Sequence, residues 1–259
     1  MKTFFKVLAS IGALVVLAII AVIFFTAGMS DTADNFFAAV KSKNMDKAYT
    51  FLTEDFKNNT SKTDLEKYLK NNSLSNFKEA NWDSRSVNGG RGKLTGSITT
   101  MSGGVVPLTV NFLKGENEWK IYSIQKPSSG IQEETTSNEI PSEKEQVKLV
   151  RESIHLFAVS VKEQNMKKLY NHTSSLFQQQ FSIEKFNKVY KSFFQYEDKL
   201  MILDNYVPKF TSKATINEDG VLALKGEYPT KPSKFTFSQK YIYEGVSWKL
   251  LGFNAHVKK

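Results

Sequence analysis

The residues best suited to acid–base or metal chemistry are three histidines and one aspartate, and their spacing points to neither chemistry. No two of His155, His172 and His256 have the i, i+4 spacing that places a pair of metal ligands on one helix face. Asp204 is the candidate for a buried acid with a perturbed pKa. The chain has no cysteine, which excludes thiol nucleophiles, disulfides and cysteine-ligated metals. We therefore expect no catalytic constellation, no cofactor and no metal site.

A long internal repeat organises the sequence. Residues 40–49 read VKSKNMDKAY and residues 161–170 read VKEQNMKKLY, with identity at six of the ten positions. The spacing of 121 residues places Phe36 on Phe157, and it widens to 129 where the segment 118–124 matches 247–253. A period of more than about 100 residues is typical of tandem globular domains, since solenoid repeats are much shorter.

The repeat also acts as an internal control for candidate functional residues. His172 falls on Phe51, which predicts a packing position, and His155 falls on Asp34. Two carboxylates of the first unit fall on uncharged residues of the second, Asp55 on Leu176 and Glu54 on Ser175. The two units therefore share packing positions, and an active site confined to one unit stays open as an alternative.

Composition and charge divide the chain into four segments: an N-terminal anchor at 1–28, a first domain at 29–125, a polar and acidic linker at 126–145 and a second domain at 146–259. Residues 29–125 hold 13 basic and 11 acidic side chains, a net charge of +2. Residues 151–259 hold 17 basic and 10 acidic side chains, a net charge of +7, so the basic character belongs mainly to the second domain.

The segment 7–25 is predicted to be a transmembrane anchor. It contains 19 residues without a charge and spans roughly 28 Å as a helix, enough to cross the hydrocarbon core. Lys2 and Lys6 precede it, so the positive-inside rule places the N-terminus in the cytoplasm and both domains on the extracytoplasmic side of the cytoplasmic membrane. The alternative is a secreted protein whose signal peptide has been cleaved.

Hydrophobic periodicity predicts helices followed by strands in each domain. In the first domain we expect helices from residue 31 to 43, from 45 to 52 and after a cap at Ser61, then strands at 78–87, 92–101, 105–114 and 118–125. In the second domain we expect helices at 145–164 and after a cap at Ser182, then strands at 199–210, 212–217, 220–229, 234–244 and 247–257. The inner face of the helix after Ser182 is expected to contain Phe186, Val189, Tyr190, Phe193 and Phe194. The fold class is α+β, with helices packed on a curved antiparallel sheet.

These elements resemble the nuclear transport factor 2-like superfamily, also described as a cystatin-like α+β cone. The resemblance is based on the paired helices around 36–49 and 157–170, and on the closing strands that contain Trp119-Lys120-Ile121 and Trp248-Lys249-Leu250. It implies a pocket between the helices and the sheet, which in enzymes of the superfamily holds an Asp, Glu or His. For the second domain the candidate pocket lining is Tyr170, Trp248 and Phe253.

A row of lysines forms a second candidate site. Lys185, Lys188, Lys191 and Lys199 are expected on the helix face opposite the aromatic stripe. Such a patch could attract anionic lipid headgroups, a cell-wall polymer or an acidic protein partner, and the alternative is an ordinary solvated face. Nucleic acid is not expected, because the predicted topology places the patch outside the cytoplasm.

The sequence therefore predicts a bacterial, membrane-anchored, extracytoplasmic binding or assembly module without catalytic activity. Its expected partners are the lipid bilayer, through residues 7–25, and a protein or anionic envelope component, and self-association stays open. Two alternatives remain. One is an envelope component of a machine similar to type IV secretion and conjugation systems, and the other is a small-ligand or enzymatic pocket in the second domain.

Overall fold

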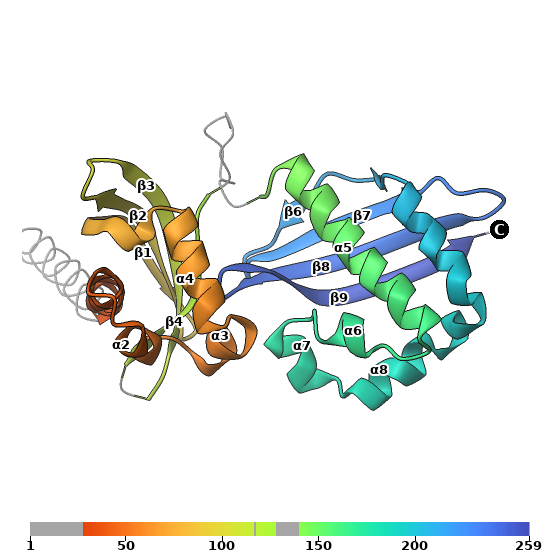
Figure 1. Ribbon diagram of the computed structural model, residues 1–259, viewed down its shortest axis with the longest axis horizontal. Coiled ribbons are helices and arrows are strands. Elements are labelled where there is room, and N and C mark those ends of the chain that lie inside the picture. Colours follow the sequence, from red (N-terminus) through yellow and green to blue (C-terminus); the bar gives the residue numbers. More distant parts are fainter. Residues whose placement is uncertain (1–27, 117, 128–139, 259) are drawn as a thin grey trace, which may run out of the picture. The chain divides into compact units, whose positions relative to one another are not determined.

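The chain forms two compact α+β units. The structure is a computed structural model that describes residues 28–116, 118–127 and 140–258. The units are Met1–Lys126 and Pro127–Lys259, and each contains helices and one antiparallel sheet (Figure 1). The predicted anchor at 7–25 and most of the predicted linker lie outside the described residues. Within the described residues, no helix is long and apolar enough to cross a membrane.

The first unit places short capped helices ahead of a four-stranded sheet. A helix that includes residues 28–41 precedes α2 (Met45–Thr50), α3 (Glu54–Asn59), α4 (Lys62–Asn71) and the 3-10 helix η1 (Leu74–Asn76). The strands are β1 (Phe77–Asn88), β2 (Arg91–Thr100), β3 (Val105–Lys114) and β4 (Trp119–Gln125), in the order β1-β2-β3-β4. Ser61 caps α4 and the strands lie at the predicted places. Helix α3 was not predicted, and Thr53 caps it by accepting the backbone N–H of Phe56.

The second unit also places its helices ahead of an antiparallel sheet. Its helices are α5 (Glu143–Lys162), α6 (Lys167–Tyr170), α7 (Ser175–Gln180), α8 (Ile183–Tyr190) and the 3-10 helix η2 (Lys191–Asn205). Its strands are β5 (Lys209–Phe210), β6 (Thr215–Ile216), β7 (Val221–Tyr228), β8 (Lys234–Glu244) and β9 (Ser247–Lys258). The sheet order is β5-β7-β8-β9, with β6 paired to β7, so β9 is an edge strand.

Two expectations for the second unit are wrong. The predicted strand at 199–210 is mostly the 3-10 helix η2, whose buried residues Leu200 and Leu203 are spaced by three, the period of such a helix. The predicted inner-face residue Val189 is 60% exposed. The five residues expected on one helix face are divided between two helices. Helix α8 ends at Tyr190, and Phe193 and Phe194 belong to η2.

Hydrogen bonds recur in the two units at the spacing seen in the sequence. The hydroxyl of Tyr49 donates to the carbonyl of Thr60 at 2.6 Å, and the hydroxyl of Tyr170, 121 residues later, donates to that of Phe181 at 2.8 Å. Where the first long helix of each unit ends, Lys43 and Gln164 both adopt the left-handed conformation, with φ of 57° and 52°. These two local features thus recur at the 121-residue spacing.

The contact between helices and closing strand recurs as well. The backbone N–H of Thr53 donates to the carbonyl of Ile121 at 3.0 Å, and that of Ser174 donates to the carbonyl of Leu250 at 2.9 Å. These donors are 121 residues apart and the acceptors 129, which are the two spacings of the sequence repeat. A register shift follows both acceptors, so each closing strand has a bulge at the same place.

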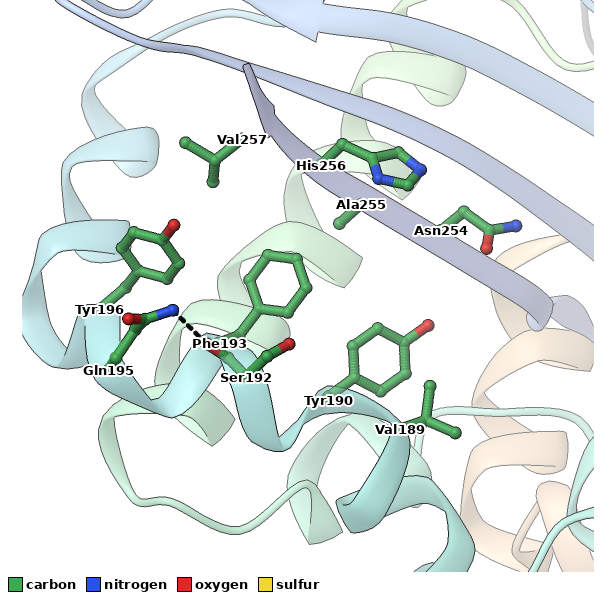
Figure 2. A pocket seen from close by; sticks show the side chains of 10 residues that line it. All are labelled: Val189, Tyr190, Ser192, Phe193, Gln195, Tyr196, Asn254, Ala255, His256 and Val257. Carbon is green, nitrogen blue, oxygen red and sulfur yellow. Dashed lines mark hydrogen bonds between the residues drawn. The ribbon is translucent and has the colours of Figure 1, made fainter. Parts of the chain in front are cut away.

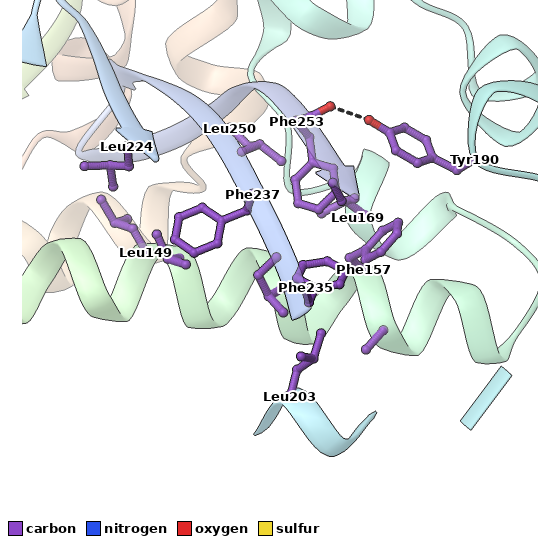
Figure 3. Close-up of a cluster of buried hydrophobic side chains, with 14 of the residues drawn as sticks. Leu149, Phe157, Leu169, Tyr190, Leu203, Leu224, Phe235, Phe237, Leu250 and Phe253 are labelled. Atoms are coloured by element: carbon purple, nitrogen blue, oxygen red, sulfur yellow. Dashed lines mark hydrogen bonds between the residues drawn. The ribbon is translucent and has the colours of Figure 1, made fainter. Parts of the chain in front are cut away.

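The core of the second unit lies between α5 and the sheet (Figure 3). It includes a polar cluster around Tyr241 and Gln239, whose matching residues in the first unit, Phe112 and Val110, are apolar. The hydroxyl of Tyr241 lies 3.0 Å from the hydroxyl of Ser153, from which it can accept a hydrogen bond. Its single proton is shared between two acceptors, the carbonyl of Leu149 at 3.0 Å and the side-chain oxygen of Gln239. Gln239 is fully buried, and its amide nitrogen has no partner within the described structure.

Candidate ligand-binding cleft

A cleft lies between the outer edge of β9 and the helices α8 and η2 (Figure 2). Its volume is about 330 Å³, and one wall comes from the helices and the other from the last residues of the strand. The helical wall consists of Val189, Tyr190, Ser192, Phe193, Gln195 and Tyr196, and the strand contributes Asn254, Ala255, His256 and Val257.

Aromatic rings form the apolar part of the cleft. Phe193 lies between the other two rings, with centroids 6.1 Å from Tyr190 and 6.1 Å from Tyr196. Its inner side contacts Phe157 of α5 edge-on at 5.1 Å, which fixes the ring against the core. Phe193 and Tyr196 are only partly buried, so both rings offer apolar surface to a bound group.

The polar groups of the cleft are hydroxyls, side-chain amides and the imidazole of His256. The hydroxyl of Tyr190 donates to the carbonyl of Phe253, and burial raises the pKa of Tyr190 to about 12, so it stays protonated. The side-chain amide of Gln195 donates to the carbonyl of Ser192 at 2.8 Å (Figure 2). None of the ten lining residues is an aspartate or glutamate. The cleft therefore offers rings and hydrogen-bonding groups, but no carboxylate for acid–base catalysis.

The length of β9 is what forms the second wall. Tyr68 of the first unit donates its hydroxyl to the carbonyl of Ile124 at 3.0 Å, as Tyr190 does to the equivalent Phe253. After this point β4 ends at Gln125, whereas β9 continues to Lys258. Asn254 matches Gln125, the last residue of β4, so the part of the wall made by residues 255–257 is an addition in the second unit.

The three residues predicted to line a pocket do not line this cleft. Trp248 is buried and packs edge-on against Tyr243 at 5.3 Å, and Phe253 is buried against Phe157 at 4.9 Å. Tyr170 is half-buried, and its ring contacts Phe177. All three belong to, or pack against, the hydrophobic core cluster, and none of them lines the cleft beside β9.

The four predicted patch lysines are exposed. Lys185 and Lys188 lie on α8, Lys191 begins η2 and Lys199 lies further along it. Within the described residues none of the four forms an ion pair, although Asp198, next to Lys199, pairs with Lys162 at 2.9 Å. Lys188 and Lys191 lie within two residues of Val189 in the sequence, so part of the row borders the cleft.

A second, shallow groove lies along α5 and contains the predicted acid Asp204. Its carboxylate lies 2.8 Å from Nδ1 of His155, and Arg151 donates to its backbone carbonyl at 3.0 Å. A His–Asp pair can position a general base, but it needs a nucleophile within reach. The lining hydroxyl, Ser142, is 13 residues from His155, about 20 Å along a helix, and it caps α5.

His172 occupies a partly buried position, as its match with Phe51 predicts. Its side chain is 18% exposed and Nδ1 lies 4.0 Å from the carboxylate of Glu152. Burial lowers the pKa of His172, Glu152 opposes this shift and Lys249 adds to it. Within the described part of the chain, no group of three His, Asp or Glu side chains could hold a metal ion.

Sequence reasoning missed the cleft because its two walls are far apart in the chain. The sequence predicts Phe193 in the helix after Ser182 and places Tyr196 between that helix and a strand at 199–210, whereas both residues belong to η2. One signal was present in the sequence. The first closing strand is predicted to end at residue 125, which matches residue 254, whereas the second is predicted to continue to residue 257. A comparison of the repeat units could have shown that the strand is longer.

Comparisons with known proteins add little to this description. No protein-family model matches the chain, and no curated protein matches it. A solved structure, of a cystatin-like protein from Ruminococcus gnavus ATCC 29149, is similar with 10% sequence identity and a TM-score of 0.30. The alignment covers 94% of this chain and 96% of that one. A likeness at this level does not define a site, and the cleft is described from its own residues.

Proposed function

We propose that this protein is a non-catalytic binding module and that the cleft beside β9 in the second unit is its binding site. The observation that supports this proposal best is that the partly buried rings of Phe193 and Tyr196 face the extended strand, in a lining without any carboxylate. Binding sites commonly combine apolar rings with a few hydrogen-bonding groups, as this cleft does.

The recurrence of hydrogen bonds at 121 and 129 residues supports a further part of the proposal, that the two units are copies of one domain. On this view the second copy acquired a binding site when its closing strand was extended and its helix after Lys191 changed. The first copy, whose closing strand ends at Gln125, serves as a spacer or support.

The proposal includes an anchor at residues 7–25, with both units on the extracytoplasmic side. The uncharged 19-residue segment and the preceding lysines support this placement. A membrane-held chain would present the cleft to a component of the cell envelope. Intact cells treated with a protease should lose the second unit while the extreme N-terminus stays protected. Protection of the whole chain would contradict the placement.

Site-specific photo-crosslinking tests the binding site directly. A photo-reactive phenylalanine analogue at Ser192, in the cleft, should give a discrete adduct in native membranes. The same analogue at Asn71, the position in the first unit that matches Ser192 at a spacing of 121, is the control and should give none. Equal adducts at both positions, or none at Ser192, would overturn the proposed site. Mass spectrometry of the adduct would also show whether the partner belongs to a type IV secretion-like assembly.

A further inference from the structure

Along the first half of β9, backbone groups on the outer edge form hydrogen bonds with the helical part of the unit. Along the second half, these groups are open. The backbone carbonyl of Leu250 accepts the N–H of Ser174 at 2.9 Å, and the next outward carbonyl, that of Phe253, accepts the hydroxyl of Tyr190. Beyond Phe253, the strand's outward groups face the cleft.

Strand geometry identifies the open groups. In an antiparallel pair, residues alternate between those whose N–H and C=O both face the partner strand and those whose groups both face away. Since the Phe253 carbonyl faces away from β8, the same holds for the N–H and C=O of Ala255 and Val257. Within the described part of the chain, neither Ala255 nor Val257 makes a main-chain hydrogen bond with any segment other than the neighbouring strand β8.

Proteins usually cover or shorten such edges, because an open edge pairs with other chains. The first unit follows this rule, because β4 ends at Gln125 and Tyr68 covers its end. The hydroxyl of Tyr68 accepts the N–H of Lys126 at 3.2 Å and donates to the carbonyl of Ile124. Lys126 is the equivalent of Ala255. In the second unit the strand continues and the matching edge stays open, next to partly exposed rings.

We propose that the edge of β9 at Ala255 and Val257 binds an extended peptide segment of a partner protein, which adds to the sheet as a strand. This proposal rests on the proposed function of the cleft and specifies its ligand. Backbone groups supply the hydrogen bonds in this mode of recognition, and alternate side chains of the peptide give specificity. One apolar side chain would pack on Phe193 and Tyr196.

Charge indicates the composition of the peptide. The lining contains no carboxylate, Lys188 and Lys191 lie beside it in the sequence, and residues 151–259 carry 17 basic against 10 acidic side chains. An acidic segment would be attracted to this surface, whereas a basic one would be repelled. The peptide that fits best is therefore short, extended and acidic, with an apolar residue at its centre.

The test uses the full chain in detergent and a phage-displayed library of random twelve-residue peptides. The best selected peptide is synthesised with single backbone N-methyl groups at two neighbouring central positions, because only one of two neighbours directs its N–H toward β9. We expect the methyl group on the β9 side to weaken binding about tenfold or more, and the one on the other side to change it less than about twofold.

A change in the protein gives an independent measurement. Val257→Pro removes one outward N–H and leaves the β8 ladder intact, so it should weaken the peptide by about tenfold. A proline at the corresponding edge of the first unit, Lys126→Pro, lies outside the cleft and should leave peptide binding unchanged. Hydrogen exchange on the unmodified chain should show protection of the Ala255 and Val257 amides when the peptide is bound, so the test stands even if the proline variant unfolds.

Three results would overturn the inference. The first is a library that yields no peptide binding at the cleft. The second is an equal effect of the two N-methyl groups on the affinity of the peptide. The third is a dimer of the chain itself that occupies the edge and is broken by Val257→Pro. A non-peptide adduct at Ser192 in the crosslinking experiment, together with either of the first two results, would leave the binding cleft standing and remove only strand addition.

Discussion

At the scale of single residues, the second unit differs from the first by polar groups placed in its core. Val110 and Phe112 of the first unit match Gln239 and Tyr241 at a spacing of 129, and all four are buried. Burial also raises the pKa of Tyr241, so its hydroxyl acts only as a hydrogen-bonding group. The unpartnered amide nitrogen of Gln239 is the costly element, since a buried donor without an acceptor costs about 1–3 kcal/mol.

Replacing these residues with those of the first unit should separate their contributions. We expect Gln239→Val to leave the free energy of unfolding unchanged or to raise it by about 1 kcal/mol, because it removes the unpartnered donor. Tyr241→Phe alone should lower it by about 1–3 kcal/mol, because Leu149 and Ser153 lose their partner. Urea unfolding measures both. A loss of more than about 2 kcal/mol in Gln239→Val would show that the amide has a partner in solution.

His172 should make the stability of the second unit depend on pH. Burial lowers its pKa from the ordinary value of 6.5, so the unfolded chain binds the proton more tightly than the folded one. The stabilisation is therefore present above pH 6.5 and decreases as the pH falls below it. The variant His172→Phe, which copies Phe51, should show a smaller loss of stability between pH 7 and pH 5 than the natural protein. Identical slopes in paired urea titrations would contradict this.

At the scale of elements, hydrophobic periodicity predicted the helices and strands of the first unit better than those of the second. Alternation in the segment 105–114 gave β3 correctly, because Leu108, Val110 and Phe112 are buried on one face, although Thr109 on the other face is buried as well. The same method failed at 199–210, where apolar residues three apart belong to a 3-10 helix that short windows cannot distinguish from a strand. The cleft escaped prediction because tertiary packing, and not local pattern, brings η2 beside β9.

The ends of the two long helices offer a matched pair of stability tests. Lys43 and Gln164 hold φ of 57° and 52°, a conformation that costs an L-residue about 1–2 kcal/mol and glycine very little. We expect Lys43→Gly and Gln164→Gly each to raise the free energy of unfolding by up to about 1 kcal/mol. Alanine at either position keeps the strain and should give no gain. If glycine destabilises one unit only, the two helix ends are not equivalent in solution.

At the scale of the whole molecule, each unit holds a core of its own. The second unit's core cluster runs from Leu149 to Ala255, entirely within its own residues. Domains of about 100 residues with a separate core usually unfold as independent two-state units. The polar segment between them has a composition that buries little apolar surface, so it contributes little to either core.

Fragments 28–127 and 140–259 should therefore each fold. In the second fragment the single tryptophan, Trp248, is 6% exposed, so its fluorescence should be blue-shifted and should move to longer wavelength in one cooperative urea transition. The far-ultraviolet circular dichroism of the fragments should add up to that of residues 28–259 across the same titration. A fragment 140–259 with solvent-like tryptophan emission would show that the second unit needs the first. The binding site would then have to be assigned to the chain as a whole.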